Sequence, residues 1–225
     1  MHKNSIRHMR ALVERYLDAS LPLSIGDIGS FDYNGSYRSL FTSPQWKYTG
    51  IDLEAGPNVD LILTSPYAFP VPDGHFDVIV SGQAFEHVKF FWLTWKEMVR
   101  TLKPGGLIFL IAPSRGPEHR YPVDCWRFYP DGFRALAEYG EIECLEAHTD
   151  WAEYPGARGG AWGDTVGVFA KPPYVLLPSA QQWLRRHASV PARSVADRAA
   201  SMITRSVDAT LRGLVRRARR RSNST

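Results

Sequence analysis

Two acidic residues lie in glycine-containing segments at the ends of two apolar runs near the start of the chain. The first run ends in Gly26-Asp27-Ile28-Gly29, and the second ends in Gly50-Ile51-Asp52. A glycine turn after one strand lets a ligand approach the backbone, and a carboxylate after the next can accept hydrogen bonds from both hydroxyls of a ribose. The chain has neither a GxxxxGK(S/T) nor a GxGxxG motif. The pattern therefore favours a cofactor with a ribose but no phosphate over NAD or ATP.

A second group of ionisable side chains follows the most hydrophobic run of the chain, 107–113. The group consists of Glu118, His119, Asp124 and Arg127. We predict that His119 acts as a general base on a hydroxyl, that Asp124 orients its ring, and that Arg127 binds an anionic group of a substrate. The alternative is an ordered loop in which Arg127 pairs with Asp124 and His119 faces solvent.

Aromatic side chains in the glycine-rich segment 151–164 are candidates for contact with a substrate. Trp151, Tyr154 and Trp162 could stack on a sugar ring or a planar acceptor, or pack as a lid without touching a substrate. His87 follows another apolar run, and a structural role is favoured for it over a catalytic one. The two cysteines, Cys125 and Cys144, can form neither a disulfide framework nor a Cys-rich zinc site, and no metal site is predicted.

Alternating strands and helices must position these residues. Strands are expected within 21–30, 46–54, 59–63, 75–82, 107–113, 141–151 and 165–172. Helices are expected in the first 20 residues, within 36–46, from 90 to 102 and from 130 to 139. Because parallel strands need crossovers, this order predicts an α/β, Rossmann-like, doubly wound fold. Its sheet should be seven-stranded and mostly parallel, with helices on both faces and a C-terminal helical tail.

Four segments of the chain resemble the class I S-adenosylmethionine-dependent methyltransferases, in their small methyltransferase-domain branch. They are the Asp-Ile-Gly turn at 27–29, Gly-Ile-Asp at 50–52, AFPVPDGHFDVIVSGQAFEHV and LKPGGLIFLIAP, and the resemblance covers roughly residues 20–172. It implies S-adenosyl-L-methionine as the cofactor. Phe31 stands where the family usually has a second glycine, and Ser65 stands where it often has an aspartate that binds the adenine.

The resemblance also implies roles for individual residues. The loop after the first strand would hold the methionine moiety, the acid after the second strand would bind the ribose, and the pair at 65–66 would frame the adenine. Carried over by position, the cofactor-binding residues are Asp27, Gly29, Asp52, Leu53, Ser65, Pro66 and Ser81.

Charge is distributed unevenly along the 225 residues. Residues 183–225 contain 11 Arg against two Asp, a net charge of +9, so the net charge of +4 for the whole chain leaves −5 for residues 1–182. We therefore expect a methyltransferase domain over 1–172, a linker over 173–194 and a basic amphipathic helix and tail over 195–225. The tail favours an anionic membrane surface. A partner-binding helix, non-specific nucleic-acid attraction and a solvated tail are the alternatives, and no specific nucleic-acid partner is expected.

The predicted function is S-adenosylmethionine-dependent O-methylation of a hydroxylated small molecule, such as a sugar or glycan intermediate. The protein is expected to be cytoplasmic, because no run of 18 apolar residues and no secretory signal is present. The alternative is a non-catalytic cofactor-fold module in which Phe31 narrows the pocket and the tail makes the protein a scaffold at a membrane or a partner. An NAD-dependent enzyme is disfavoured, because the pyrophosphate turn is missing.

Overall fold

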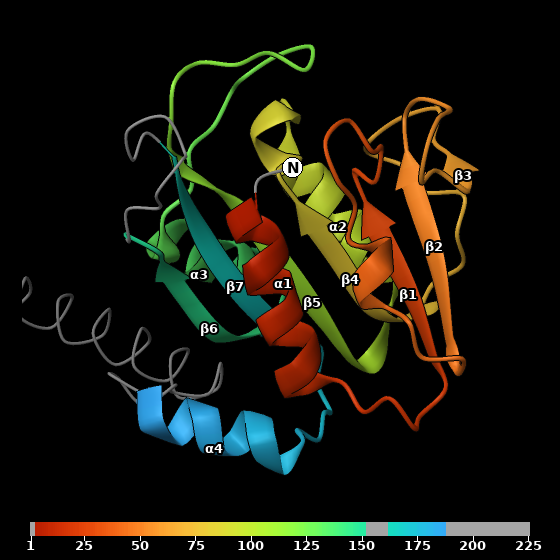
Figure 1. The fold of residues 1–225 in the computed structure, drawn as a ribbon, viewed down its shortest axis with the longest axis vertical. Coiled ribbons are helices and arrows are strands. Elements are labelled where there is room, and N and C mark those ends of the chain that lie inside the picture. Colours follow the sequence, from red (N-terminus) through yellow and green to blue (C-terminus); the bar gives the residue numbers. More distant parts are fainter. Residues whose placement is uncertain (1–2, 152–161, 188–225) are drawn as a thin grey trace, which may run out of the picture. The chain divides into compact units, whose positions relative to one another are not determined.

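A seven-stranded sheet forms the centre of the protein in a computed structural model, which describes residues 3–151 and 162–187. Its strand order is β3-β2-β1-β4-β5-β7-β6, and only β7 runs antiparallel to its neighbours (Figure 1). The strands are β1 (Leu23–Ile28), β2 (Trp46–Asp52), β3 (Leu61–Ile62), β4 (Phe76–Gly82), β5 (Leu102–Arg115), β6 (Glu143–Thr149) and β7 (Gly163–Ala170). The Rossmann-like, doubly wound fold is thereby confirmed.

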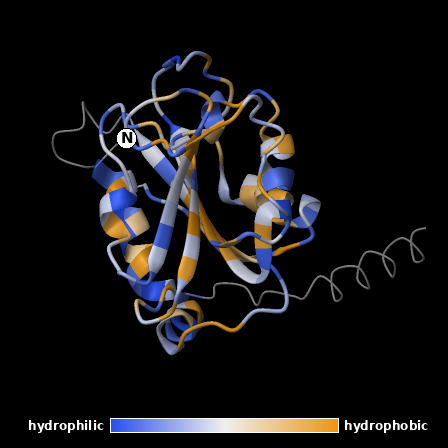
Figure 2. Ribbon diagram, turned by 90° about the vertical axis from the view of Figure 1, so that its right-hand side faces the viewer, coloured by the Kyte–Doolittle hydropathy of each residue, from blue (hydrophilic) through white to orange (hydrophobic). Residues whose placement is uncertain are grey.

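Helices cover both faces of this sheet, as Figure 2 shows from its edge. The α-helices are α1 (Lys3–Tyr16), α2 (Phe91–Thr101), α3 (Pro130–Tyr139) and α4 (Pro178–His187), and the short 3-10 helices are η1 (Arg38–Leu40) and η2 (Phe85–His87). None of the helices in the described part of the chain has an apolar stretch long enough to cross a bilayer.

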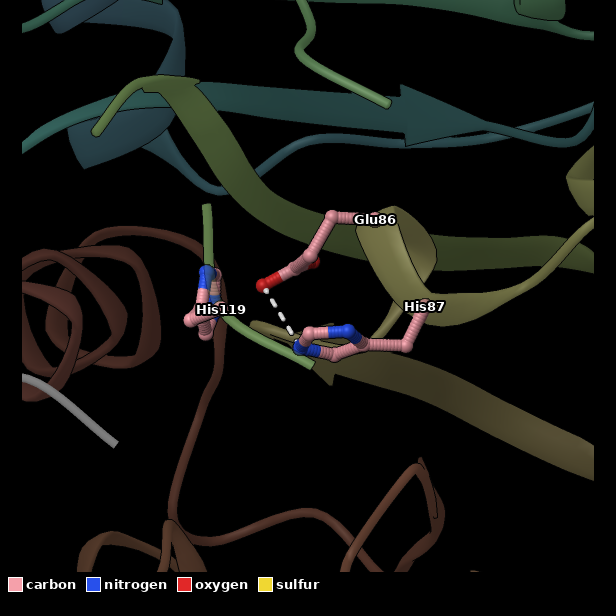
Figure 3. Close-up of side chains that lie close together, drawn as sticks. All are labelled: Glu86, His87 and His119. Atoms are coloured by element: carbon pink, nitrogen blue, oxygen red, sulfur yellow. Dashed lines mark ion pairs between the residues drawn. The ribbon is translucent and has the colours of Figure 1, made fainter. Parts of the chain in front are cut away.

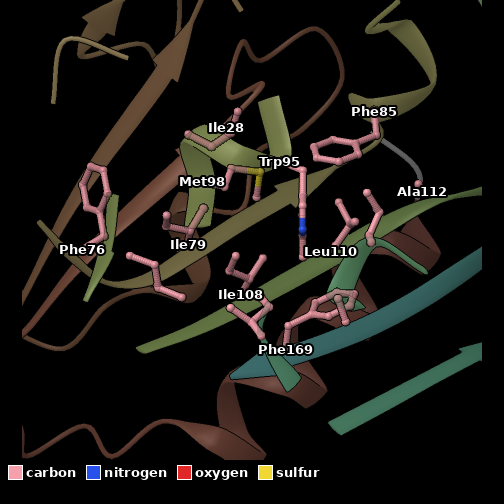
Figure 4. Close-up of a cluster of buried hydrophobic side chains, with 14 of the residues drawn as sticks. Ile28, Phe76, Ile79, Phe85, Trp95, Met98, Ile108, Leu110, Ala112 and Phe169 are labelled. Carbon is pink, nitrogen blue, oxygen red and sulfur yellow. The ribbon is translucent and has the colours of Figure 1, made fainter. Parts of the chain in front are cut away.

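Two hydrophobic cores, one on each face, hold the helices to the sheet. On one face Trp95 and Met98 of α2 share a core with Ile79 of β4 and Ile108 of β5 (Figure 4). In the same core Phe133 of α3 packs against Phe169 of β7. On the other face Met9 and Leu12 of α1 belong to the second core. Both helices carry their apolar residues at steps of three and four, so one stripe of each is buried. The packed helices thus hold the carboxyl ends of β1, β2 and β4 in fixed positions along one edge of the sheet.

The first crossover differs from expectation, because the helix expected within 36–46 is reduced to the three residues of η1. The buried ring of Tyr37 precedes it and its hydroxyl bonds to Ser5 of α1. This contact ties the short crossover to α1, which covers the face that a longer crossover helix would cover.

The segment expected to be a linker contains an ordered helix. Within 173–194, residues 178–187 form α4, which packs on α1. The guanidinium of Arg15 lies 3.9 Å from the ring of Trp183, the hydroxyl of Ser179 donates a 2.7 Å hydrogen bond to the Arg15 carbonyl, and Ala180 is fully buried. The compact unit that contains the sheet therefore runs to His187, beyond the expected domain boundary at 172. The basic helix and tail expected over 195–225 lie outside the described residues.

Asp27 is a buried carboxyl within the sheet. Its side chain accepts a hydrogen bond from the Tyr48 hydroxyl, and burial raises its pKa to about 7. In the unfolded chain the same carboxyl would titrate near its ordinary value of about 3.9. Between these two values the folded state binds the proton more tightly, so ionisation of Asp27 reduces stability as the pH rises from about 4 to about 7.

We therefore predict that Asp27→Asn raises the free energy of unfolding, relative to the wild type, more at pH 8 than at pH 4.5. Asparagine can still accept the Tyr48 hydrogen bond but has no charge to bury. The difference in unfolding free energy between the variant and the wild type should grow by about 1 kcal/mol or more over this pH range. Urea unfolding at several pH values measures it. Asp131→Asn is the control, because that carboxyl is 97% exposed, and a pH-independent effect of Asp27→Asn would contradict the prediction.

Candidate cofactor and acceptor site

A cavity of about 610 Å³ opens at the carboxyl ends of β1, β2 and β4. Because β1 lies between β2 and β4 and all three are parallel, the loops that follow them meet at one edge of the sheet. This edge is the topological switch point at which doubly wound folds bind ligands. Residues 119–122 after β5 and Trp162 before β7 complete the wall.

Gly29 shapes the loop after β1. Its φ is +79°, and a Cβ atom built there would lie 2.4 Å from the Cβ of Ala84 in the loop after β4. Its N–H donates a 2.9 Å hydrogen bond to the carbonyl of Ile51 in β2. Only glycine satisfies both the left-handed backbone and the close approach, so the residue predicted from the Asp-Ile-Gly turn lines the cavity for a steric reason.

Asp52 is held at the end of β2 by two backbone donors. Its carboxylate oxygens accept hydrogen bonds from the N–H of Phe31 at 2.8 Å and from its neighbour Leu53 at 2.7 Å. Each oxygen keeps a further lone pair for a ligand donor. The carboxylate lines the cavity and is oriented before any ligand binds, so the residues present fit a ribose with two hydroxyls.

Phe31 stands in the position of the family's second glycine and forms part of the cavity wall. Its ring stacks on Tyr33 with centroids 4.4 Å apart, while its backbone N–H still reaches Asp52. The ring therefore lies beside the Asp52 carboxylate as a wall, and the cavity keeps its volume of about 610 Å³.

Apolar side chains enclose the part of the cavity where the adenine was expected. Leu53, Leu63, Pro66 and Phe69 line it. Ser65 does not line it, and its hydroxyl instead accepts a 3.2 Å hydrogen bond from the N–H of Tyr67. Pro66 thus lies in an apolar part of the cavity wall, whereas the Ser65 hydroxyl belongs to a local turn.

Two other predicted cofactor residues lie behind the cavity wall. Asp27 is bonded to Tyr48, and the fully buried Ser81 donates a 2.8 Å hydrogen bond to the carbonyl of Ile28. Neither is among the lining residues. In this structure their side chains connect neighbouring strands beneath the loops that form the wall.

The loop after β5 brings the predicted base and its partner together. The Asp124 carboxylate accepts a 2.8 Å hydrogen bond from the backbone N–H of His119 and lies 3.4 Å from Nδ1 of the His119 ring. Arg127 donates to both Asp124 oxygens and to the carbonyl of Pro117. These hydrogen bonds from Arg127 hold the pKa of the Asp124 carboxyl well below its usual range.

Arg127 therefore orders the loop by pairing with Asp124, as the alternative interpretation of the sequence had it. Its guanidinium is occupied by Asp124 and Pro117, and it is not among the residues that line the cavity. The same alternative interpretation had His119 facing solvent, but His119 lines the cavity.

His87 and Glu86 lie beside His119, as Figure 3 shows. The two imidazole rings are nearly perpendicular, with centroids 4.8 Å apart, and both line the cavity. Glu86 is fully buried, neither of its carboxylate oxygens has a hydrogen-bond partner among the described residues, and burial raises its pKa to about 8. Sequence reasoning missed Glu86, although an acid next to a histidine just after β4 was the available signal.

The aromatic segment after β6 is only partly described. The ring of Trp162 lies edge-on to His119 with centroids 4.7 Å apart and lines the cavity. Trp151 is 58% exposed and stacks near Tyr129, away from the lining residues, whereas Tyr154 lies outside the described residues. Of the three predicted aromatic contacts, Trp162 is the one that the structure places in the cavity wall.

The chain is similar in sequence and fold to known methyltransferases. A family model described as "Methyltransferase domain" matches residues 32–110. An uncharacterized methyltransferase of Mycolicibacterium gilvum is 26% identical over 168 residues, which cover 66% of this chain and 63% of the relative. The ubiquinone/menaquinone biosynthesis C-methyltransferase UbiE of a Shewanella species is 32% identical over 90 residues, which cover 40% of this chain and 35% of the relative.

Solved structures share the fold. The 1,6-didemethyltoxoflavin-N1-methyltransferase of Burkholderia thailandensis, solved with S-adenosylhomocysteine, superposes with a TM-score of 0.56 and 13% identity, over 75% of this chain and 77% of that one. Residues 32–110 thus match a methyltransferase domain, and at 13% identity the solved structure shows that the fold is shared. The methyltransferases that the chain resembles in sequence and fold use S-adenosylmethionine as their cofactor. The chain spans less than two thirds of the length of either sequence relative.

We predict that Asp52→Ala weakens binding of S-adenosylmethionine by about 10- to 100-fold, because it removes hydrogen bonds to a charged acceptor. Isothermal titration calorimetry measures the dissociation constant, and thermal unfolding shows whether the variant is folded. Asp73→Ala is the matched control, since that exposed carboxylate pairs with Arg100 outside the cavity. Unchanged affinity in a folded Asp52→Ala protein would show that the ribose does not bind here.

Proposed function

We propose that this protein transfers a methyl group from S-adenosylmethionine to an oxygen of a hydroxylated small molecule, such as a sugar or glycan intermediate. The observation that carries the proposal is that the oriented carboxylate of Asp52 and the imidazoles of His87 and His119 line one cavity. A ribose-binding group and a group able to activate a hydroxyl thus act on the same enclosed space.

Residues of β1, β2 and the loop after β3 would hold the cofactor. Asp52 would accept the two ribose hydroxyls, Gly29 would let the methionine portion approach the backbone, and Leu53 and Pro66 would enclose the adenine. When bound, S-adenosylmethionine supplies a methyl group on a positively charged sulfur. The chain's own contribution is then to position the acceptor, to exclude water and to help the hydroxyl lose its proton.

The loop after β5 supplies those contributions at the acceptor end. Asp124, fixed by Arg127, anchors the backbone of His119 beside the cavity that His119 lines. The rings of Trp162 and Tyr121 lie near His119 and offer flat apolar faces on which a sugar ring can stack. Arg120 also lines the cavity and would favour an acceptor carrying negative charge.

Oxygen is the favoured acceptor atom because an unactivated hydroxyl needs help to lose its proton, and imidazoles provide that help. The matched Shewanella relative is named for C-methylation and the Burkholderia structure for N-methylation. A direct test incubates the protein with S-adenosylmethionine labelled in its methyl carbon and a panel of sugars, nucleotide sugars and phenols. Label recovered on carbon or nitrogen would refute O-methylation, and no binding of cofactor at millimolar concentration would favour the non-catalytic scaffold.

We predict that His119→Ala lowers turnover of the best acceptor by about 100-fold or more. The affinity for S-adenosylmethionine should change little, because Asp52 and Gly29 are untouched. Initial rates and calorimetry on the same samples separate the two effects. His75→Ala, at the opposite end of β4, is the matched control. Equal rates for His119→Ala and the wild type would remove His119 from the reaction.

We also propose that the Arg-rich segment of residues 188–225 attaches the protein to anionic membrane surfaces. Its charge supports this, because the segment contains nine Arg. Basic residues near an anionic surface contribute roughly 1 kcal/mol each to membrane binding.

Truncation after His187 should accordingly leave a folded body that binds S-adenosylmethionine, since residues 1–187 form one compact unit. It should abolish sedimentation with vesicles containing phosphatidylserine. Binding of the full chain to these vesicles should weaken as salt rises, because surface charges are screened within about 8 Å at physiological ionic strength. A full chain that ignores the vesicles but binds DNA with a steep salt dependence would refute the membrane proposal.

A further inference from the structure

We propose that Glu86, His87 and His119 form a binding site for one divalent transition-metal ion with the ligand preference of zinc. One ligand atom from each residue lies within 4.8 Å of the others. The use of this ion in methyl transfer rests on the function proposed above, whereas the binding of the ion does not. The proposal specifies how the acceptor hydroxyl is activated.

Glu86 is the first observation that points to a cation. Its side chain is fully buried, and both carboxylate oxygens lack a hydrogen-bond partner among the described residues. An ionised carboxylate that is buried without hydrogen-bond donors is costly, and buried charges in proteins are normally hydrogen-bonded and paired or bound to metals. The Oε1 atom lies 3.6 Å from Nε2 of His87, so the carboxylate is directed at the imidazole pair (Figure 3).

The tautomer of His87 suits a metal ligand. Its Nδ1 lies 2.5 Å from the carbonyl oxygen of Val123, an acceptor, so Nδ1 carries the proton. Nε2 then has a free lone pair, and this is the atom that faces Glu86. Metal-bound histidines typically donate their other ring N–H to a backbone carbonyl in this way, which fixes the ring orientation.

His119 lies in the loop after β5, which is hydrogen-bonded to the segment that carries Glu86 and His87. Besides the bond between His87 and Val123, the N–H of Cys125 donates a 2.7 Å hydrogen bond to the carbonyl of Glu86. These two bonds hold the loop after β5 against η2. The Asp124 carboxylate lies 3.4 Å from Nδ1 of the His119 ring, but that nitrogen has no hydrogen-bond partner among the described residues.

The donor set selects the class of metal. Two imidazole nitrogens and one carboxylate oxygen suit Zn²⁺ and related first-row ions, whereas Mg²⁺ and Ca²⁺ prefer oxygen ligands. Neighbouring ligands of a tetrahedral ion with bonds of about 2.1 Å lie about 3.4 Å apart. The Glu86–His87 separation of 3.6 Å is close to that value, and a separation of 4.8 Å closes with an inward shift of about 1.4 Å by a ring.

The open coordination positions would face the cavity, because His87 and His119 line it. With three protein ligands, a zinc-like ion keeps at least one position for a water or a substrate oxygen. An acceptor hydroxyl bound there would release its proton to solvent more readily. The preferred acceptor class is therefore one with a hydroxyl beside a second oxygen, such as a vicinal diol. His119 would then act as a ligand of the ion in place of a free base.

Metal binding can be measured on the full chain without any acceptor. Protein stripped with a chelator and then dialysed is titrated with ZnCl₂ and, separately, with MgCl₂ by calorimetry, and metal content is measured after gel filtration. We expect one Zn²⁺ per chain, no Mg²⁺ binding at the same concentrations, and a rise in melting temperature with Zn²⁺. Glu86→Gln and His119→Ala should each weaken Zn²⁺ binding at least 10-fold. His187→Ala, at an exposed histidine on α4, should not.

The outcomes separate this proposal from methyl transfer. Glu86→Gln keeps the size of the side chain, and its thermal unfolding without metal shows that it is folded. Glu86→Gln protein that loses Zn²⁺ but binds S-adenosylmethionine like the wild type supports the site. Two results would overturn the metal site: no Zn²⁺ binding by the wild type, or wild-type Zn²⁺ affinity in both Glu86→Gln and His119→Ala. Neither result would bear on cofactor binding or methyl transfer, which have their own measurements.

Discussion

The close approach of Gly29 to Ala84 is the constraint on which the site depends. It brings the loop after β1 against the loop after β4, with room for no side chain between them. The hydrogen bonds from Gly29 to Ile51 and from Phe31 to Asp52 then tie the same loop to β2. Three strand ends are thereby locked into one edge, and the cavity is the space that they enclose.

Carboxyl groups near this edge differ in what surrounds them, and that difference separates their roles. Asp52 is oriented by two backbone N–H groups and remains open to a ligand. Asp27 is buried with Tyr48 as its partner and belongs to the sheet. Glu86 is buried with His87 3.6 Å away and with no hydrogen-bond donor among the described residues, so a cation bound between the two side chains would stabilise its carboxylate. Residue type alone does not distinguish these three environments.

The acceptor end is built by a loop rather than by a strand or helix. Arg127, Asp124 and the backbone of His119 form a continuous set of hydrogen bonds, which gives a segment without regular structure a defined conformation. Loops held in this way by a rigid scaffold are where binding and chemistry concentrate. The two hydrogen bonds that join this loop to η2 place His119 beside His87.

Patterns in the sequence predict the strands, the buried stripe of α1, and the glycine turn and acid at Gly29 and Asp52, because local periodicity and turn chemistry act over a few residues. Those patterns do not show that Ser81 and Asp27 lie behind the wall, that residues 178–187 form a helix packed on α1, or that Glu86 meets His119. These outcomes depend on burial and on contacts between segments far apart in the chain. Glu86 and His119 are separated by a whole helix and strand, and only the adjacency of β4 and β5 brings them together.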